Sequence, residues 1–303
     1  MSKIIVIGSS NTDLAIKTDS IPEPGETVIG GKFMMTAGGK GANQAVAAAR
    51  LGGDVAFVTK VGDDMFGDES RARYVKEGLP EKFLLVEKGT PSGMALITVD
   101  AKGENCIVVA PGANNTLSPA DVDAVRGEIE AAEYLLMQLE VPMETVEHAA
   151  EIAAASGTKV ILNPAPAAKL SEKLIANLYL VTPNRTECQL LSGLRIDSDE
   201  DARRAAARLM EMGARNVIIT LGAKGALVFD GAHCEIVPAY KTQAVDTTAA
   251  GDVFNGALVV ALSEGRTLPE AVRFACKASA ISVTRVGAQN SVPYRTEVDV
   301  FNL

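Results

Sequence analysis

The segment that bears most directly on chemistry runs from Asp246 to Asp252 (DTTAAGD) and is followed by the apolar sequence VFNGAL. Small residues ahead of a helix permit a turn whose backbone N–H groups point at one anion, and the helix dipole adds positive potential there. Such a nest would stabilise the negative charge on a phosphoryl group during its transfer. Asp252 falls in the first helical turn, where it could accept a proton from an attacking hydroxyl or merely complement the dipole. The spacing leaves both interpretations open.

Two further segments carry groups that suit a sugar. Residues 38–43 (GGKGAN) combine glycines, which permit close backbone approach to a ligand, with Lys40 and Asn43 as donors. Taken alone, this segment favours a flexible turn that leads into the Ala-rich stretch after it. Asn11 and Asp13 supply paired oxygen acceptors after the first apolar run, although both residue types also form Asx turns.

The segments TPNRTE at residues 182–187 and YLLMQLE at residues 134–140 carry further polar candidates. Asn184 and Glu187 have the spacing of a capping box, and the sequence alone favours that structural interpretation. The functional alternative puts Asn184 near phosphates and Glu187 near a hydrated Mg²⁺. Glu140 follows an apolar strand, where its carboxylate could be solvated or could hold a hydroxyl.

Several common catalytic patterns are absent from the sequence. It contains no Walker A motif, no G-x-G-x-x-G after the first apolar run and no G-x-S-x-G elbow. His148 and His233 have no partners at metal or triad spacing. The four cysteines are scattered, which argues against a zinc site or a disulfide framework and predicts buried thiols in a reducing cytoplasm.

Composition sets the class of protein. The 303 residues carry a net charge of −9 and are 47% hydrophobic, so a sizeable core is expected and nucleic acid or anionic membranes are poor partners. The first apolar run is too short for a signal peptide, and no stretch is long enough for a transmembrane helix. These features predict a soluble, cytoplasmic protein.

The hydrophobic pattern alternates between strands and helices along most of the chain, which predicts a mostly parallel sheet covered on both faces. Expected strands are 4–7, 54–61, 134–139, 159–162, 178–182 and 216–221, with a late antiparallel pair at 226–229 and 234–237. Expected helices are 41–51, 65–78, 143–155, 185–191, 200–212, 250–262 and 268–286.

One part of the chain breaks this alternation. Residues 92–100 and 105–110 resemble the two strands of a hairpin, and residues 27–35 are also strand-like. We expect a small separate sheet, inserted at about 14–37 and 90–112 into a single α/β domain that spans residues 1–303. Ligands of open α/β sheets bind beyond the carboxyl ends of the strands. Polar residues fall at several such ends, which predicts one shared site: Asn11, Asp13, Glu140, Asn163, Asn184, Thr220 and Gly222.

Read together, eight segments make the sequence similar to the PfkB-type carbohydrate kinases over essentially its whole length. In chain order they are GSSNTD, PGET, GGKGANQAVAAARLG, LLMQLE, TPNRTE, TLGAKG, AVDTTAAGDVFNGAL and VTRVGAQNSVP. The resemblance implies a three-layer α/β/α core with a mostly parallel central sheet and a small β-sheet lid. It also implies a homodimer in which the lids of two subunits pack together.

The resemblance assigns roles to individual positions. The sugar would be bound by Asn11, Asp13, Gly39, Lys40, Asn43 and Glu140. Asn184 would lie near the ATP phosphates, Glu187 would help to hold Mg²⁺ through water, and the nucleotide would contact Thr220, Gly222, Lys224, Gly225 and Cys276. An anion hole would form from Ala249, Ala250, Gly251 and Asp252, with Asp252 as the base. A K⁺ ion that activates the enzyme would be bound by Asp246, Thr248, Ser282, Arg285, Gly287 and Ser291.

Within this family, the chain resembles the branch that phosphorylates D-ribose at O5 with ATP. Many relatives carry Gly-Ala-Gly-Asp where this chain has Ala249-Ala-Gly-Asp, and the alanine would matter only if that position needed a positive φ. The alternatives are a kinase for another acceptor, such as deoxyribose, adenosine or a fructose derivative, and a non-catalytic sugar-binding regulator.

Overall fold

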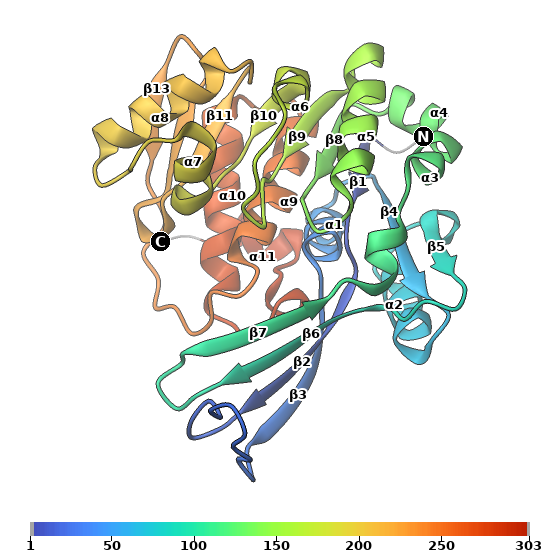
Figure 1. Ribbon diagram of the computed structural model, residues 1–303. Coiled ribbons are helices and arrows are strands. Elements are labelled where there is room, and N and C mark those ends of the chain that lie inside the picture. The colour runs from blue at the N-terminus through green and yellow to red at the C-terminus, as the bar shows by residue number, and fades with distance from the viewer. Residues whose placement is uncertain (1–2, 302–303) are drawn as a thin grey trace.

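The computed structural model describes residues 3–301 as a nine-stranded sheet with helices on both faces and a separate four-stranded sheet that projects from one end (Figure 1). The large sheet has the order β13-β12-β11-β10-β9-β8-β1-β4-β5. It is parallel from β5 to β11, and β12 and β13 add an antiparallel edge. Its strands are β1 (Ile4–Ile7), β4 (Val55–Gly62), β5 (Leu84–Glu87), β8 (Tyr134–Met137), β9 (Lys159–Leu162), β10 (Leu178–Val181), β11 (Val217–Thr220), β12 (Ala226–Phe229) and β13 (Cys234–Val237).

Alternate side chains of each central strand enter two different cores. Ile4 and Val6 of β1 pack into one, and Ile5 and Ile7 pack into the other. The first core is closed by α1 (Lys40–Arg50), α2 (Met65–Lys76), α9 (Ala250–Ser263), α10 (Leu268–Ser282) and α11 (Arg295–Val300). The second is closed by α3 (Pro119–Ala124), α4 (Arg126–Ala131), α5 (Met143–Ser156), α6 (Glu172–Asn177), α7 (Arg185–Ser192) and α8 (Asp199–Glu211). Burial on both faces explains why these strands are continuously apolar.

Helices α1 and α9 approach each other unusually closely. A Cβ added at Gly256 would lie 2.6 Å from Cβ of Ala47 and 2.7 Å from the carbonyl oxygen of Gln44, so only glycine fits there. This contact brings the first turns of α1 and α9 together beyond the carboxyl ends of the strands, where the sequence predicts the site.

The four-stranded sheet, called the small sheet below, has the order β3-β2-β6-β7. It consists of β2 (Asn11–Lys17), β3 (Lys32–Gly38), β6 (Gly93–Val99) and β7 (Asn105–Ala110), and β6 and β7 form the expected antiparallel hairpin. Because side chains alternate along a strand, Asp13 and its neighbour Ala95 share one face, and Leu14 and Leu96 share the other.

Two expectations about this region were wrong. Residues 27–31 lie outside any strand and β3 begins only at Lys32, since Gly30 and Gly31 adopt φ of 119° and 104°, which a strand does not allow. The small sheet was expected to begin at about residue 14, but β2 begins at Asn11, so Asn11 and Asp13 lie within a strand. Their polar side chains hid a strand that alternates toward the site.

Three smaller differences concern strand β5, the end of α10 and the cysteines. Strand β5 was not expected from the sequence. Helix α10 ends at Ser282 rather than at 286, because hydroxyls of Ser282 and Thr284 bond to carbonyls of its last turn. Cys188 and Cys276 are buried as predicted, whereas Cys106 is exposed on β7. Among the described residues, none of the helices is long and apolar enough to cross a membrane.

Candidate active site

Asp252 lies in the first turn of α9 with only 6% of its surface exposed. Its Oδ2 accepts a hydrogen bond from Asn43 Nδ2 and its Oδ1 accepts one from Gln44 Nε2, each over 2.9 Å. Burial raises the pKa of the Asp252 carboxyl, while the Lys40 ammonium and the two amide hydrogen bonds oppose that rise. Two donors therefore hold a desolvated carboxylate in a fixed direction, which suits a proton acceptor.

The residues before Asp252 form the turn that an anion-binding nest requires. Ala249 has φ 58° and ψ 11°, and within residues 3–301 it is the one residue other than glycine with a positive φ. A left-handed residue next to a right-handed helical turn directs successive N–H groups to one point. The position does need a positive φ, so alanine here carries roughly 1–2 kcal/mol of strain.

A cavity of about 210 Å³ opens in front of this turn. It gathers three of the seven strand-end residues that the sequence singled out, Asn163, Asn184 and Thr220, together with the start of α9. Its walls include Lys40, Asn163, Thr182, Asn184, Glu187, Thr220, Ala249, Ala250, Gly251 and Asp252. Backbone N–H groups of the nest and the Lys40 ammonium would favour an anion at this place.

Asp13 and Glu140 add two more carboxylates near Asp252 and Lys40. Burial, with repulsion from Glu140 and Asp252, raises the pKa of Asp13 to about 6, and Lys40 opposes the rise. Burial lowers the pKa of Lys40, but attraction to Asp252 and the other carboxylates outweighs this and leaves it raised. The carboxyl groups can accept hydrogen bonds from a ligand rich in hydroxyl groups, and the Lys40 ammonium can donate one to it.

Glu140 also fixes the start of α1. Its Oε2 accepts hydrogen bonds from Ser9 Oγ at 2.5 Å and from the backbone nitrogen of Lys40 at 2.9 Å. The glycines before α1 are required by space: a Cβ at Gly38 would lie 2.2 Å from the Asp13 carboxylate. At Gly39 it would lie 2.7 Å from the backbone nitrogen of Asn11, and φ is 87°. The GGKGAN segment is thus an ordered turn against β2 and not a flexible one.

Asn43 and Asn11 differ in what they leave free. The Oδ1 of Asn43 is buried and has no hydrogen-bond partner in the described part of the chain, although its Nδ2 is bonded to Asp252. The Oδ1 of Asn11 already accepts from Asn114 Nδ2 at 2.7 Å. A buried acceptor without a partner destabilises the fold, so the Oδ1 of Asn43 would gain by accepting a hydrogen bond from a ligand.

A second cavity of about 440 Å³ continues beyond the nest between the loop before α9 and helix α10. It shares Thr220, Ala250 and Gly251 with the first cavity and also contains Gly222, Gly225 and Cys276, as predicted. Its walls are mainly apolar, which suits a nucleobase. Lys224 is not on these walls, since its ammonium forms an ion pair with Asp199 on α8.

Comparison with known proteins shows which family has this sequence and fold. The model of the pfkB family carbohydrate kinases matches residues 1–295. The chain belongs to this family. It is 44% identical to the ribokinase of Haemophilus influenzae over 97% of this chain and 96% of that protein, and 39% identical to the deoxyribokinase of Salmonella typhi over 99% and 97%. The structure of Arabidopsis thaliana ribokinase complexed with ribose and ATP matches with a TM-score of 0.90 and 30% identity, over 98% of this chain and 97% of that one.

In a carbohydrate kinase of the pfkB family, the two sides of the nest would bind different substrates, the sugar and the nucleotide. Asp13 lies on β2 of the small sheet, and the apolar cavity lies toward α10. Asp252 and the nest stand between them. This is the order that transfer of a phosphoryl group from a nucleotide to a sugar requires.

Asn184 and Glu187 form the capping box that their spacing predicts, and they also lie where the functional interpretation would need them. They form a complete capping box: the backbone nitrogen of Asn184 donates to Glu187 Oε2 at 2.8 Å, and that of Glu187 donates to Asn184 Oδ1 at 2.9 Å. Both also line the smaller cavity. Burial raises the pKa of Glu187, opposed by that backbone bond and by Lys40. Each Glu187 oxygen accepts one bond and keeps a lone pair, and Mg²⁺ usually retains several waters, so this carboxylate fits a hydrated Mg²⁺.

The two segments that the sequence predicts for K⁺ lie against each other. Asp246 Oδ2 accepts from the backbone nitrogen of Gly287 at 2.8 Å, and Oδ1 accepts from that of Thr248 at 2.9 Å. Burial raises the pKa of Asp246, but these hydrogen bonds lower it more, so the carboxylate is ionised. The Arg285 guanidinium pairs with Glu297, which leaves only backbone oxygen of Arg285 for a cation. An anionic, oxygen-rich turn of this kind fits a monovalent cation.

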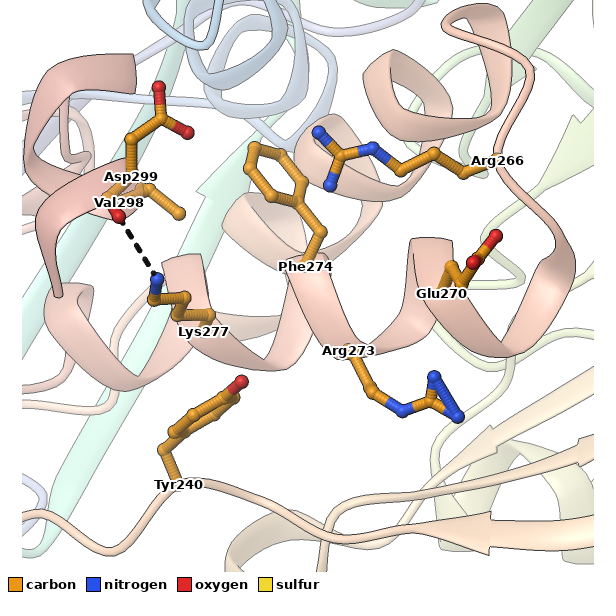
Figure 2. Close-up of a pocket in the computed structure, with 8 residues that line it drawn as sticks. All are labelled: Tyr240, Arg266, Glu270, Arg273, Phe274, Lys277, Val298 and Asp299. Atoms are coloured by element: carbon orange, nitrogen blue, oxygen red, sulfur yellow. Dashed lines mark hydrogen bonds between the residues drawn. The ribbon is translucent and has the colours of Figure 1, made fainter. Parts of the chain in front are cut away.

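Figure 2 shows a different cavity, of about 460 Å³, on the outer side of α10. Lys277 reaches across it to the carbonyl oxygen of Asp299 at 3.5 Å, and the Arg266 guanidinium lies over the Phe274 ring (Figure 2). It does not contain Asp252 or the nest, and it meets the nucleotide cavity only at Tyr240. Because it lies apart from Asp252 and the nest, we assign it no part in the reaction.

Sequence reasoning missed two buried residues that hold the site together, Gln44 and Asn114. Gln44 bonds to Asp252 itself, and Asn114 bonds to Asn11 and to the backbone of Ser10. Gln44 follows Asn43 directly in an otherwise apolar helix, so an uncharged polar residue at a buried position was its only signal. Asn114 lies in a 3₁₀ turn far from the other motifs, and the sequence gave no reason to single it out.

Proposed function

We propose that the protein transfers the γ-phosphoryl group of ATP to O5 of D-ribose, giving D-ribose 5-phosphate and ADP. The observation that carries this proposal is the position of Asp252 between hydroxyl-binding groups and an N–H nest. It is supported by the similarity to ribokinases over nearly the whole chain, one of them complexed with ribose and ATP.

In this proposal the sugar is bound by Asn11, Asp13, Gly39, Lys40, Asn43 and Glu140. The carboxyl oxygens of Asp13 and Glu140 accept hydrogen bonds from ribose hydroxyls, and the free Oδ1 of Asn43 accepts one more. Several acceptors at fixed positions select a polyhydroxylated ligand, because an analogue without a hydroxyl would leave a buried acceptor unpaired.

Asp252 then takes the proton of the attacking hydroxyl. The oxygen becomes a better nucleophile as its O–H bond breaks, and the proton forms a new bond to a carboxylate oxygen of Asp252. The raised pKa of Asp252 makes the carboxylate a stronger base, while its two amide donors favour the ionised form. The nucleophile attacks the γ-phosphorus, the bond to the β-phosphate oxygen breaks, and ADP leaves.

The N–H groups of Ala249, Ala250 and Gly251, with the Lys40 ammonium, would stabilise the charge on the phosphoryl group in flight. Mg²⁺ bound to the ATP phosphates would neutralise further charge, with Glu187 holding one of its waters. Asn184, Thr220, Gly222 and Gly225 would contact the nucleotide, and Cys276 would lie near the adenine. Since Lys224 pairs with Asp199, we leave it out of the nucleotide contacts.

We also propose that K⁺ bound by Asp246, Thr248, Ser282, Arg285, Gly287 and Ser291 orders the turn before the nest. Asp246 joins the two segments concerned, and it lies three residues before Ala249. Replacing K⁺ by tetramethylammonium should lower kcat. If kcat is unchanged, these six residues lose this role.

The outer face of the small sheet favours a homodimer. On the face opposite Asp13, a row of neighbouring side chains runs across four strands, and each is apolar: Met35, Leu14, Leu96 and Val108. Phe33 and Ile16 extend it, and Phe33 is 60% exposed. A contiguous exposed apolar surface of this kind marks an interface. Sedimentation should find a dimer that Leu96→Lys converts to a monomer.

We place the reaction in the cytoplasm, where ATP is made.

A panel of acceptors tests the proposed substrate. ADP release should be measured with D-ribose, 2-deoxyribose, adenosine and fructose 6-phosphate, each at several concentrations with Mg²⁺ and K⁺. Ribose should have the highest kcat/KM. Deoxyribose is the most informative rival, because one relative of similar identity is a deoxyribokinase. A higher kcat/KM for any other acceptor would refute the ribose assignment, and no ADP release with any of them would favour a sugar-binding regulator.

A further inference from the structure

The proposed base is held by a residue that none of the site motifs contains. Gln44 lies in the first half of α1 and is completely buried. Its Nε2 donates one hydrogen bond to Asp252 Oδ1 at 2.9 Å and a second to Asn163 Oδ1 at 3.0 Å. Its Oε1 accepts a bond from Gln138 Nε2 at 2.6 Å. The amide nitrogen of Gln44 therefore donates two hydrogen bonds and its oxygen accepts one, so neither atom lacks a partner.

The charge on Asp252 fixes the direction of these amides. A carboxylate can only accept hydrogen bonds, so Gln44 must turn its nitrogen to Asp252 and its oxygen to Gln138. Asn163 then accepts from Gln44 and donates its own Nδ2 to the carbonyl oxygen of Thr182 at 3.2 Å. Reversing any one of these amides would set two donors or two acceptors against each other.

Packing leaves Gln44 no other place. The missing side chain at Gly256 lets α9 approach the Gln44 backbone to within contact. On the other side, a Cβ at Gly8 would lie 2.1 Å from Gln138 Oε1, so the partner amide is confined as well. Gln44 is therefore clamped between α9 and the end of β8.

We propose that Gln44 is a positioning residue that anchors Oδ1 of Asp252 and so leaves Oδ2, on the side of Asn43, to receive the proton from the acceptor hydroxyl. In the proposed function the unpaired Oδ1 of Asn43 binds the sugar, so the bond from Asn43 Nδ2 to Asp252 Oδ2 can break during the reaction. The amide of Gln44 bonds only to Asp252, Asn163 and Gln138, and it does not touch substrate. The inference rests on the proposed role of Asp252 as the base.

Gln44 also opposes protonation of Asp252. The charged groups around this carboxylate are Lys40 on α1, Asp13 on β2, Glu140 after β8 and Glu187 on α7. Of these only Lys40 favours the ionised form, while the three acids disfavour it. A neutral amide donor at 2.9 Å favours the ionised form whatever the protonation state of those neighbours. Without it, the pKa of Asp252 should rise further.

The test compares the pH dependence of kcat, at saturating ribose and ATP, in the wild type and in Gln44→Met, which keeps the length of the side chain and removes the donor. The acidic limb of the profile should move upward by about one pH unit, because a hydrogen bond to a charged group is worth that much. The loss of activity should reach about tenfold at pH values below the limb and should disappear at pH values well above it. An equal loss at every pH, with the limb unmoved, would overturn the proposal.

Gln138→Met is the matched control. Gln138 is as deeply buried and lies in the same network, but it contacts Gln44 and not Asp252. It should lower thermal stability without moving the acidic limb, and an equal shift in this variant would refute a specific role for Gln44.

If Gln44→Met does not fold, Gln44→Glu keeps the shape and the bond from Gln138. It puts a second carboxyl beside Asp252, so the acidic limb should again move upward. An unmoved limb would overturn the inference. Asp252→Asn separates this failure from failure of the proposed function: if it is inactive while the limb stays unmoved in the Gln44 variants, only the role of Gln44 is lost.

Discussion

The amide of Asn43 donates from Nδ2 to Asp252 Oδ2 over 2.9 Å, and its own Oδ1 is left without a partner among the described residues. One side chain therefore connects the proposed base with the place where the acceptor hydroxyl would bind. Asn43→Leu removes both contacts at similar volume. We expect kcat/KM for ribose to fall about 10- to 100-fold, since a hydrogen bond to a charged group contributes about 1.5–3 kcal/mol. Steady-state kinetics should register the loss in kcat and in KM together, and a change in KM alone would contradict the contact with the base.

Asp13 makes ribose affinity depend on pH. Its pKa of about 6 means that the carboxylate becomes protonated just below neutral pH. We expect the Kd for ribose, measured by calorimetry without ATP, to rise about tenfold between pH 7 and pH 5 as an acceptor is lost. In Asp13→Asn the affinity should be weak at both pH values, and a Kd that still changes tenfold would assign the titration to another group.

The same residue should cost stability in the absence of sugar. Because the pKa of Asp13 is raised from 3.8 to about 6 in the folded state, the folded protein binds this proton more tightly than the unfolded chain. Its contribution to the free energy of unfolding is then fully present below pH 3.8 and is lost as the pH rises through about 6. Asp13→Asn should stabilise the ligand-free protein by about 1–3 kcal/mol at pH 7.5 and by much less at pH 4. Urea unfolding at the two pH values measures this, and equal effects at both would contradict it.

Ala249 lies in the left-handed region at φ 58°, where a side chain is strained. Ala249→Gly removes the strain but gives the unfolded chain more freedom, so we expect stability to be unchanged or to rise by up to about 1 kcal/mol, with kcat kept. Ala249→Val should lower kcat at least about tenfold, because a β-branched residue would distort the nest. Thermal unfolding and ADP release check both, and a fully active valine variant would show that the nest geometry is not needed.

Asn255 holds the Gly251 peptide of the nest through a side-chain hydrogen bond. Its Nδ2 donates to the carbonyl oxygen of Gly251 at 2.8 Å, and its Oδ1 accepts from Thr182 Oγ1 at 2.6 Å. Asn255→Leu frees the Gly251 peptide and should lower kcat about tenfold, with the Kd for ribose within twofold of the wild type. Ribose Kd and kcat, measured on one preparation, separate the two effects. A matching loss of ribose affinity would mean that the variant disturbs the whole site.

The sequence predicted most of the fold because periodicity reports burial directly. Strands such as Ile4–Ile7 and Lys159–Leu162 are apolar on both faces and were found at their observed bounds. Strand β2 was not found, because Asn11 and Asp13 occupy the positions that face the ligand and break the apolar pattern. Strand β3 was misplaced because Gly30 and Gly31 stop it at a point that β-branched neighbours suggested was extended.

The site divides in the same way. Residues in glycine-rich or strand-end segments, such as Lys40, Thr220 and Asp252, were found because those segments have a recognisable chemistry, and one cavity holds all three. Gln44 and Gln138 could not be found, since their contact with each other and with the strand-end residue Asn163 depends on glycines at positions 8 and 256. Asn184 and Glu187 could not be assigned to one role, because the structure uses them for a helix cap at the wall of the cavity.

The central claim is that Asp252 removes the proton from the sugar hydroxyl, and Asp252→Asn tests it most directly. Turnover should be measured as ribose-dependent ADP release at saturating ATP, Mg²⁺ and K⁺, and ribose binding should be measured by calorimetry on the same preparation. We predict that kcat falls at least about 100-fold, the lower range for loss of a general base, while the Kd for ribose changes by less than about tenfold. Turnover close to that of the wild type would contradict the account.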